Sequence, residues 1–352
     1  MLVREFDFEL PDDLIAQDAA PRGTSRLLVL DRTTGAITHT SIEMLPAVLR
    51  AGDLLVSNNT RVFAARLLGR REPSGGAVEC LLLSPPVPDA DGRAVCDALV
   101  HPGQKLKPGA LMRFEGPEGT LVGEVLERHY FGRRRIHLRA AQGGTVDSLI
   151  DRLGHTPLPP YIHRPDVPAD RARYQTIFAA VRGSVAAPTA GLHFTRAILD
   201  ALAARAVELA TLTLHVGYGT FKPVRSERVE HHTVEPEPYD IDDAAAEQIA
   251  RARRERRRII AIGTTTTRAL EDAAIRGEGH VVAGRAQAAT FIYPGFAFQV
   301  IDGLLTNFHV PRSSLLMLVC AFGGRERVLG AYREAVAHRY RFYSYGDAML
   351  VL

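Results

Sequence analysis

The chain has 352 residues, 46% of them hydrophobic, and a formal net charge of +3 at pH 7. This length can bury a large core and predicts two domains, while the small charge allows a nucleic-acid partner without demanding one. Three widely spaced cysteines without a C-x-x-C pair indicate a reduced, cytoplasmic protein without structural zinc. We expect no signal peptide in the acidic N-terminus and no membrane span, because the longest apolar run, residues 315–322, is too short.

Near the N-terminus, an apolar strand predicted over residues 52–57 runs directly into a polar loop. That loop consists of Asn58, Asn59, Thr60 and Arg61. Two amides, a hydroxyl and a guanidinium after a buried strand favour a binding loop, because loops at strand ends often carry sites. An Asx-turn without a binding role is the alternative.

From residue 62 to about residue 144, short alternating strands are separated by turns rich in glycine and proline. Five or six such strands without a helical period predict a small antiparallel barrel or sandwich. Arg133, Arg134 and Arg135 form the densest basic cluster of this region, and basic residues on a small barrel suit a phosphate backbone. A solvated, charged barrel surface is the alternative.

The rest of the chain alternates strands with helices, which predicts an α/β core. We expect strands at residues 207–215, 258–262 and 300–305, with polar residues at strand ends. These polar residues are His193, His215 with Gly217 and Gly219, the threonines 264–267 with Arg268, and Asn307 with His309. Because such loops converge on one face in α/β proteins, they are predicted to build a ligand crevice.

Residues 257–272, R-R-I-I-A-I-G-T-T-T-T-R-A-L-E-D, combine a buried strand, a glycine turn and a helix. We expect a sharp turn at Gly263 and a helix from Arg268. An arrangement of this kind gathers free backbone N–H groups and hydroxyls, which favours a phosphate, a carboxylate or a ribose-bearing ligand. A threonine N-cap with exposed threonines beside it is the alternative.

The sequence lacks the G-x-S-x-G, H-E-x-x-H and Walker motifs. His231 and His232 are adjacent, so on a strand they would point to opposite faces and could not hold a metal together. We therefore predict a metal-free pocket of imidazoles, hydroxyls, an amide and an arginine, suited to proton transfer on a polar, ribose-containing molecule. These patterns predict an enzyme without naming its reaction.

A set of short motifs resembles one known family across essentially the whole chain. In chain order they are N-N-T-R from Asn58, P-L-P-P-Y-I from Pro157, A-A-P-T-A-G-L-H-F from Ala186, L-H-V-G from Leu214 with G-T-F from Gly219, G-T-T from Gly263, T-N-F-H from Thr306 and S-Y-G-D-A-M from Ser344. Together they resemble the S-adenosylmethionine:tRNA ribosyltransferase-isomerases of queuosine biosynthesis. The resemblance implies an α/β fold: a distorted α/β barrel-like main domain, residues 1–61 and 145–352, with a small antiparallel β-barrel inserted at residues 62–144.

The resemblance also implies the reaction. In it, the ribosyl part of S-adenosylmethionine is transferred to 7-aminomethyl-7-deazaguanine at the tRNA wobble position and rearranges, giving epoxyqueuosine-tRNA, adenine and methionine. S-adenosylmethionine is then a substrate, and we expect no cofactor and no metal. The expected partner is tRNA carrying that base, with no membrane partner, and the expected state is a monomer.

Because the family motifs do not assign roles residue by residue, the roles follow from residue chemistry. The candidates for catalysis are His193, His215, His232 and His309 for proton transfer and Arg268 as partner of the methionine carboxylate. The candidate substrate-binding residues are Asn58, Asn59, Thr60, Arg61, Thr189, Gly217, Gly219, Thr220, Thr264, Thr265, Asn307 and Tyr345. The candidate tRNA-binding residues are Arg133, Arg134 and Arg135.

The sequence departs from the family pattern at a few positions. Where the family usually has a second histidine after the one matched by His232, this chain has Glu235. Tyr218 stands in place of an alanine, and Thr266 with Thr267 in place of a serine and a valine. Two alternatives to the family reaction therefore stay open: a paralogue acting on another acceptor, and a catalytically silent RNA-binding protein on the same scaffold.

Overall fold

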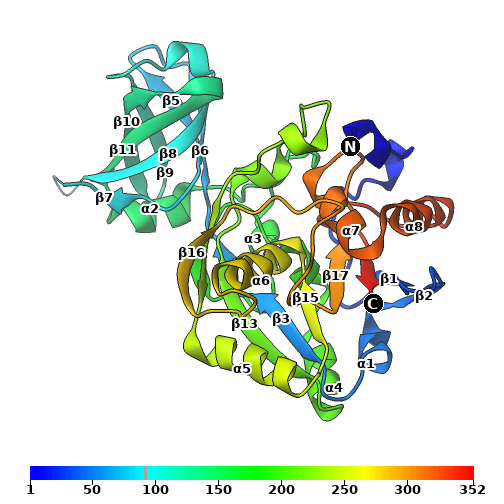
Figure 1. The fold of residues 1–352 in the computed structure, drawn as a ribbon. Helices are drawn as coiled ribbons and strands as arrows, with labels where there is room; N and C mark the ends of the chain where they lie inside the picture. Colours follow the sequence, from blue (N-terminus) through cyan, green and yellow to red (C-terminus); the bar gives the residue numbers. More distant parts are fainter. Residues whose placement is uncertain (91–92) are drawn as a thin grey trace.

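A nine-stranded mixed sheet forms the centre of the larger domain in this computed structural model, which describes residues 1–90 and 93–352 (Figure 1). The strand order is β16-β14-β13-β3-β15-β17-β18-β1-β2. In chain order these strands are β1 (Arg26–Leu30), β2 (Ile37–Ser41), β3 (Leu54–Asn58), β13 (Glu208–Leu214), β14 (Glu237–Ile241), β15 (Ile259–Ile262), β16 (Gly284–Ala288), β17 (Gly303–Asn307) and β18 (Ala348–Val351).

The neighbouring strands β13, β3, β15 and β17 run parallel to one another. Strands β3, β15 and β17 are buried along their whole lengths, as expected for parallel strands that are covered on both faces. Their register pairs Ile260 with Leu55 and Ile262 with Leu305. The carboxyl ends of all four strands therefore lie at the same edge of the sheet.

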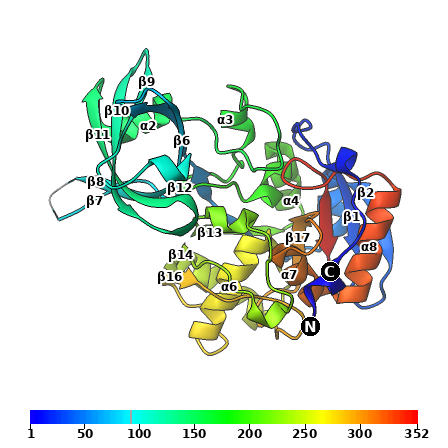
Figure 2. The same cartoon turned by 90° about the horizontal axis from the view of Figure 1, so that it is seen from above.

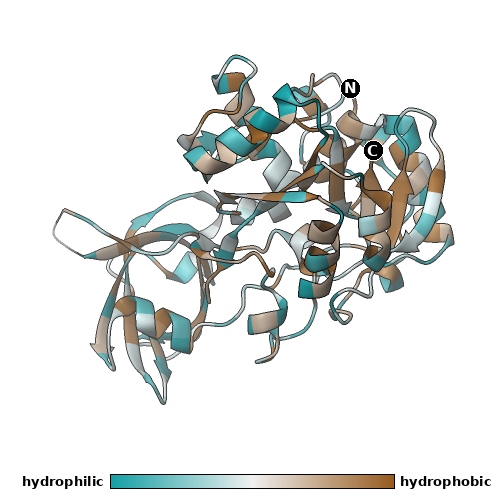
Figure 3. Ribbon diagram, turned by 90° about the horizontal axis from the view of Figure 1, so that it is seen from below, coloured by the Kyte–Doolittle hydropathy of each residue, from teal (hydrophilic) through white to brown (hydrophobic). Residues whose placement is uncertain are grey.

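Helices cover both faces of the sheet, as two views show (Figures 1 and 2). The helices are α1 (Leu45–Val48), α4 (Arg196–Ala204), α5 (Asp243–Arg254), α6 (Thr264–Arg276), α7 (Ser314–Gly323) and α8 (Arg325–Ala337). Helices α5 to α8 share a core with Leu54 and Val56, whereas α1 and α4 share a second core with Leu55 and Ile260. Figure 3 shows that the strands of this sheet are mostly apolar, while the helices also carry hydrophilic residues.

Six antiparallel strands close into a barrel beside the α/β domain (Figure 2). They are β5 (Arg66–Glu72), β6 (Ala77–Leu82), β8 (Ala94–His101), β9 (Leu111–Gly116), β10 (Gly119–Arg128) and β11 (Arg133–Gln142). The barrel closes because β11 pairs with both β10 and β8, and a short strand β7 (Val87–Pro88) extends the sheet beyond β8. Helix α2 (Val146–Leu153) contributes Leu149 and Ile150 to the barrel core.

The barrel joins the main domain through a two-stranded parallel sheet of β4 (Thr60–Val62) and β12 (Val181–Ser184). The short helix α3 (Asp170–Arg173) lies in the return segment. The remaining elements are the 3-10 helices η1 (Val3–Phe6), η2 (Asp12–Leu14), η3 (Ile42–Met44), η4 (Gly103–Lys105), η5 (Tyr130–Gly132), η6 (Thr189–His193), η7 (Tyr218–Phe221) and η8 (Val229–His231).

The predicted fold class, α/β with an inserted small antiparallel β-barrel, is confirmed. In the main domain, expected to be a distorted α/β barrel, the described strands form a sheet with β16 and β2 at its two edges. The division at residues 62 and 145 stays a prediction, and α2 packs with the barrel although that division assigned it to the main domain. One helix differs from its expected bounds: α6 begins at Thr264 rather than at Arg268. The difference arises because Gly263 alone makes the turn, so the threonines form the first helical turn.

Candidate active site

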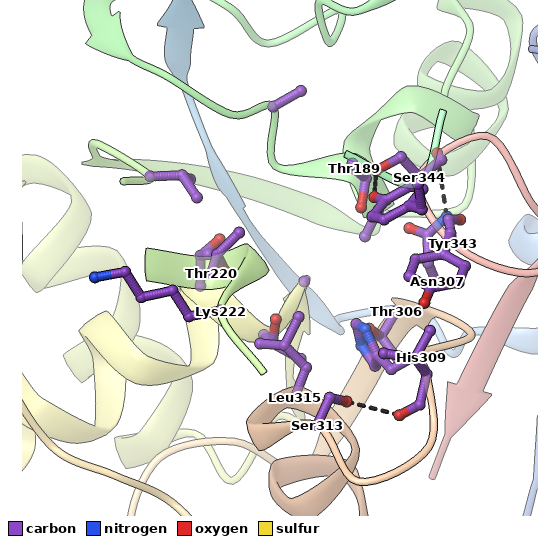
Figure 4. Close-up of a pocket in the computed structure, with 18 of the residues that line it drawn as sticks. Thr189, Thr220, Lys222, Thr306, Asn307, His309, Ser313, Leu315, Tyr343 and Ser344 are labelled. Atoms are coloured by element: carbon purple, nitrogen blue, oxygen red, sulfur yellow. Dashed lines mark hydrogen bonds between the residues drawn. The ribbon is translucent and has the colours of Figure 1, made fainter. Parts of the chain in front are cut away.

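A cavity of about 650 Å³ opens where the strands β15 and β17 end (Figure 4). Its walls come from chain segments that are far apart in sequence, including those around Tyr161, Lys222 and Tyr343. The predicted site residues that line it are Thr189, Thr220, Thr264, Thr265, Asn307 and His309. This volume is in the range of small-molecule sites.

The turn at Gly263 brings two of these segments together. Gly263 has a φ of 93°, which favours glycine, and its N–H donates to the Leu305 carbonyl at 2.7 Å. That bond fixes the turn against β17. As a result, Thr264 and Thr265 start α6 next to the strand end that carries Asn307.

The four threonines at the start of α6 divide into two pairs. The hydroxyl of Thr266 donates to the Ile262 carbonyl at 2.7 Å, and that of Thr267 donates to the Gly263 carbonyl at 3.2 Å. These two residues are therefore satisfied within the turn. Thr264 and Thr265 line the cavity instead, and the Thr265 hydroxyl oxygen is buried without a hydrogen-bond partner among the described residues.

His309 is the histidine of the predicted catalytic set that lines the cavity. Its Nε2 lies 2.9 Å from the Thr306 hydroxyl, and its backbone N–H donates to the Tyr332 hydroxyl at 3.1 Å. Burial lowers the pKa of the His309 imidazole to about 3, so the ring is neutral near pH 7. A neutral ring of this kind can accept a proton, and its protonated form is a strong acid.

His193 lies behind this wall, in a small crevice with Ser25 and Tyr345, rather than in the cavity itself. Its Nδ1 is 2.8 Å from the Ser25 hydroxyl. Burial lowers the pKa of His193 to about 4, and the nearby Asp347 carboxylate and Asn307 amide act in the opposite direction. The side-chain NH₂ of Asn307 donates to the Tyr343 carbonyl at 3.0 Å, which holds Asn307 between His193 and the cavity.

The polar residues that follow β3 mainly form hydrogen bonds to the end of β13. The Asn58 amide donates to the Leu214 carbonyl at 2.8 Å and accepts from the Leu214 N–H at 3.1 Å. Thr60 lies 2.8 Å from His215 Nδ1, and Asn59 accepts from the Thr213 hydroxyl at 2.7 Å. Burial lowers the pKa of His215. These contacts position the ends of β3 and β13 outside the main cavity.

Arg61 is exposed and lines a separate cavity of about 330 Å³. Arg171 and Arg182 also line this cavity. Arg182 is paired with Asp151 at 3.0 Å. The predicted binding loop therefore divides into two parts. Its first three residues contact the end of β13, whereas Arg61 lines the separate cavity near the connection to the barrel.

Arg268 forms a buried ion pair with a residue that the sequence analysis did not select, Glu237. Arg268 Nη1 lies 2.6 Å from the Glu237 carboxylate, which also accepts the Gly217 N–H at 2.9 Å. Burial raises the pKa of Glu237, although the Arg268 charge opposes this. Both residues line a small cavity of about 50 Å³ with Gly219, and this cavity shares Thr220 with the main one.

The turn around Glu235, where the sequence departs from the family pattern, lies at the rim of the main cavity. Lys222, which lines the main cavity, pairs with the Glu235 carboxylate. His232 packs edge-on against Phe291 with ring centroids 5.1 Å apart, and burial lowers its pKa. Neither His232 nor Glu235 lines the main cavity.

The remaining predicted residues, Tyr345 and the three barrel arginines, do not line the main cavity. Tyr345 is buried and donates to Asp170 at 3.2 Å. Arg134 is only 1% exposed and donates to the Leu106 carbonyl at 2.8 Å, so its guanidinium lies inside the barrel. Arg133 and Arg135 are exposed, and Arg133 pairs with Asp97 at 2.6 Å.

Several cavity residues were present in the sequence motifs but were given no role. Tyr161 belongs to P-L-P-P-Y-I and Ser344 to S-Y-G-D-A-M, and their hydroxyl groups are hydrogen-bonded to each other at the cavity. Tyr343 stacks on Tyr161 with ring centroids 3.8 Å apart. No sequence pattern marked Lys222 or Arg312, two basic residues of the lining.

Within the described part of the chain, the group that could hold a metal is His39, Glu334 and His338. The three lie outside the cavity lining, and the predicted absence of a metal stays a prediction. Among the helices of residues 1–90 and 93–352, none combines the length and apolar character needed to cross a bilayer.

A family model described as queuosine biosynthesis protein matches residues 3–351. The chain belongs to this family. A family member from Heliobacterium modesticaldum, named S-adenosylmethionine:tRNA ribosyltransferase-isomerase, is 49% identical over 353 residues, and the match covers all of both chains. A member of the same name from Aquifex aeolicus is 48% identical over 354 residues, again covering both chains fully.

A solved structure supports the same assignment. The crystal structure of S-adenosylmethionine tRNA ribosyltransferase from Thermotoga maritima has a TM-score of 0.55 and 36% identity, covering 99% of this chain and 100% of that one. The resemblance inferred from the sequence motifs is thus confirmed. The roles of single site residues stay predictions for this queuosine biosynthesis protein.

The lowered pKa values predict how stability depends on pH. In the unfolded chain His193 and His309 titrate near 6.5, whereas in the folded chain their pKa values are about 4 and about 3. Below pH 6.5 the unfolded state therefore binds more protons, so stability is full above pH 6.5 and falls as the pH falls towards 4. Urea denaturation of His309→Gln across this range should give a pH slope shallower by about one proton. Parallel curves for the variant and the parent would contradict the burial of a neutral His309.

Proposed function

We propose that this protein transfers the ribosyl group of S-adenosylmethionine to 7-aminomethyl-7-deazaguanine at the tRNA wobble position and isomerises it. The products are epoxyqueuosine-tRNA, adenine and methionine. The proposal rests on one observation: the motifs A-A-P-T-A-G-L-H-F, G-T-T and T-N-F-H, which lie far apart in sequence, meet in one cavity. The relatives that carry this activity in their names match the chain over its full length.

The cavity suits the proton transfers that this reaction needs. The sulfonium of S-adenosylmethionine acidifies the adjacent C–H, and a base has to remove its proton. His309 is neutral near pH 7, so its ring can accept a proton, and its protonated form can pass a proton to the departing adenine. Thr306, 2.9 Å from its Nε2, orients the ring. His193, which acts through Asn307, is a positioning residue.

In this proposal, tRNA contacts both the barrel and the cavity. Arg133 and Arg135 are exposed on β11 and can contact phosphates, whereas Arg134 supports the barrel from within. S-adenosylmethionine is a substrate, and the reaction uses no cofactor and no metal. The protein acts in the cytoplasm as a monomer.

A second candidate is a paralogue that uses S-adenosylmethionine on a different acceptor. The observation that favours it is the ion pair between Glu235 and Lys222, because Glu235 replaces the histidine usual in the family and Lys222 lines the cavity. Both candidate functions use the same cavity for S-adenosylmethionine, and they differ only in the molecule that accepts the transferred group.

Adenine release tests the main proposal. Incubation of the protein with S-adenosylmethionine and tRNA bearing 7-aminomethyl-7-deazaguanine should release adenine, and a chelator should leave the rate unchanged. His309→Ala should lower the rate by about 10²-fold or more, the range of general acid–base catalysis. Adenine released only with another acceptor would favour the paralogue. No release with any acceptor, or a rate lost to chelator and restored by one metal, would contradict the proposal.

The tRNA surface is tested by an Arg133→Ala/Arg135→Ala variant that leaves the buried Arg134 in place. We expect weaker tRNA binding and a flatter salt dependence, with the slope of log K against log salt reduced by about one to two, because each phosphate contact contributes about 0.9. Affinity for S-adenosylmethionine should not change. The matched control is Arg253→Ala/Arg254→Ala on the exposed face of α5. Normal tRNA binding by the first variant and weak binding by the control would show that the wrong surface was chosen.

A further inference from the structure

The N-terminus of α6 faces the cavity without a side-chain cap. The first N–H groups of a helix have no partner within the helix, which holds here for those of Thr264, Thr265 and Thr266. The preceding residue, Gly263, has no side chain, and within the described chain no side chain caps α6. By contrast, Asp242 caps α5 by accepting the Ala245 N–H at 2.7 Å.

A buried hydroxyl points to a ligand at the same place. Thr265 is only 7% exposed, lines the cavity, and has a hydroxyl oxygen that lacks a hydrogen-bond partner among the described residues. Leaving such a group unpaired is costly, so a group that accepts its hydrogen bond would stabilise the site. The neighbouring hydroxyls of Thr266 and Thr267 are already satisfied by backbone carbonyls.

The lining of the cavity is compatible with an anion as that group. Among the described residues that line it, none is Asp or Glu, and the basic residues Lys222 and Arg312 are paired with the carboxylates of Glu235 and Asp7 outside the lining. The positive end of the α6 helix dipole therefore supplies the field that attracts an anion. Backbone N–H groups at a helix start bind carboxylates and phosphates well.

We propose that the N-terminus of α6, with the Thr265 hydroxyl, binds the carboxylate of the methionine part of S-adenosylmethionine. This rests on the proposed function, which supplies a substrate with one carboxylate. Arg268, the alternative partner, is already paired with the buried Glu237 carboxylate at 2.6 Å, which neutralises its charge. The four donors at α6 carry no such counter-charge.

The discriminating variant is Thr265→Asp, tested with two ligands. An aspartate in the first helical turn interacts favourably with the helix dipole, but its charge repels a carboxylate. In calorimetric titrations of the full chain, it should weaken binding of S-adenosylmethionine by about tenfold or more. Binding of decarboxylated S-adenosylmethionine, which lacks the carboxylate, should change by less than about twofold.

Two more variants complete the design. Thr265→Val keeps the shape and removes only the hydroxyl, so it should weaken S-adenosylmethionine binding by a smaller factor and leave the decarboxylated ligand unaffected. It also tests the proposal if Thr265→Asp fails to fold. Ala244→Asp is the matched control, because Ala244 is the exposed second residue of α5, as Thr265 is the second residue of α6. It should leave both affinities unchanged.

Other outcomes overturn the assignment. Equal loss for both ligands, or no loss for S-adenosylmethionine in Thr265→Asp and Thr265→Val, would exclude the carboxylate site. Loss of tRNA affinity alone would assign the α6 N-terminus to a tRNA phosphate. Adenine release by the unchanged protein reports separately on the proposed function: if S-adenosylmethionine binds with the expected pattern but no adenine is released, the proposed function fails and the carboxylate site stands.

Discussion

The parallel pairing of β13, β3, β15 and β17 is the constraint on which the candidate site depends. It places four carboxyl ends at one edge of the sheet, so the segments that follow them have to meet there. The hydrogen bond from the Gly263 N–H to the Leu305 carbonyl, at 2.7 Å, fixes two of these ends against each other. The segments that follow β13, β15 and β17 line the cavity, whereas the segment that follows β3 lies outside it.

Several polar groups at this edge stabilise the structure rather than face the cavity. Asn58 joins β3 to β13, and Arg268 with Glu237 forms a buried ion pair. Such groups are paired because an unpaired buried polar group is costly. The Thr265 hydroxyl and the Asn307 amide oxygen depart from this pattern, since both are buried, belong to residues that line the cavity and lack a hydrogen-bond partner among the described residues.

The barrel and the convergence of loops could be predicted because both follow from local patterns. Alternating strands with glycine and proline turns marked β5 to β11, and strand–helix alternation marked the α/β domain. The sequence could not separate buried from exposed members of one motif. Arg134 lies inside the barrel between two exposed arginines. The Thr266 hydroxyl donates to the Ile262 carbonyl, whereas the Thr265 hydroxyl lacks a partner among the described residues. These differences depend on tertiary contacts that a local pattern does not contain.

In the proposed function, the cavity at the ends of β15 and β17 holds S-adenosylmethionine. A crystal structure of the protein with S-adenosylmethionine bound would test this placement. We expect ligand density in the cavity, with the carboxylate on the backbone N–H groups that follow Gly263 and the reacting carbons near His309. Density for the ligand in the separate cavity lined by Arg61 and Arg182, with the main cavity empty, would contradict it.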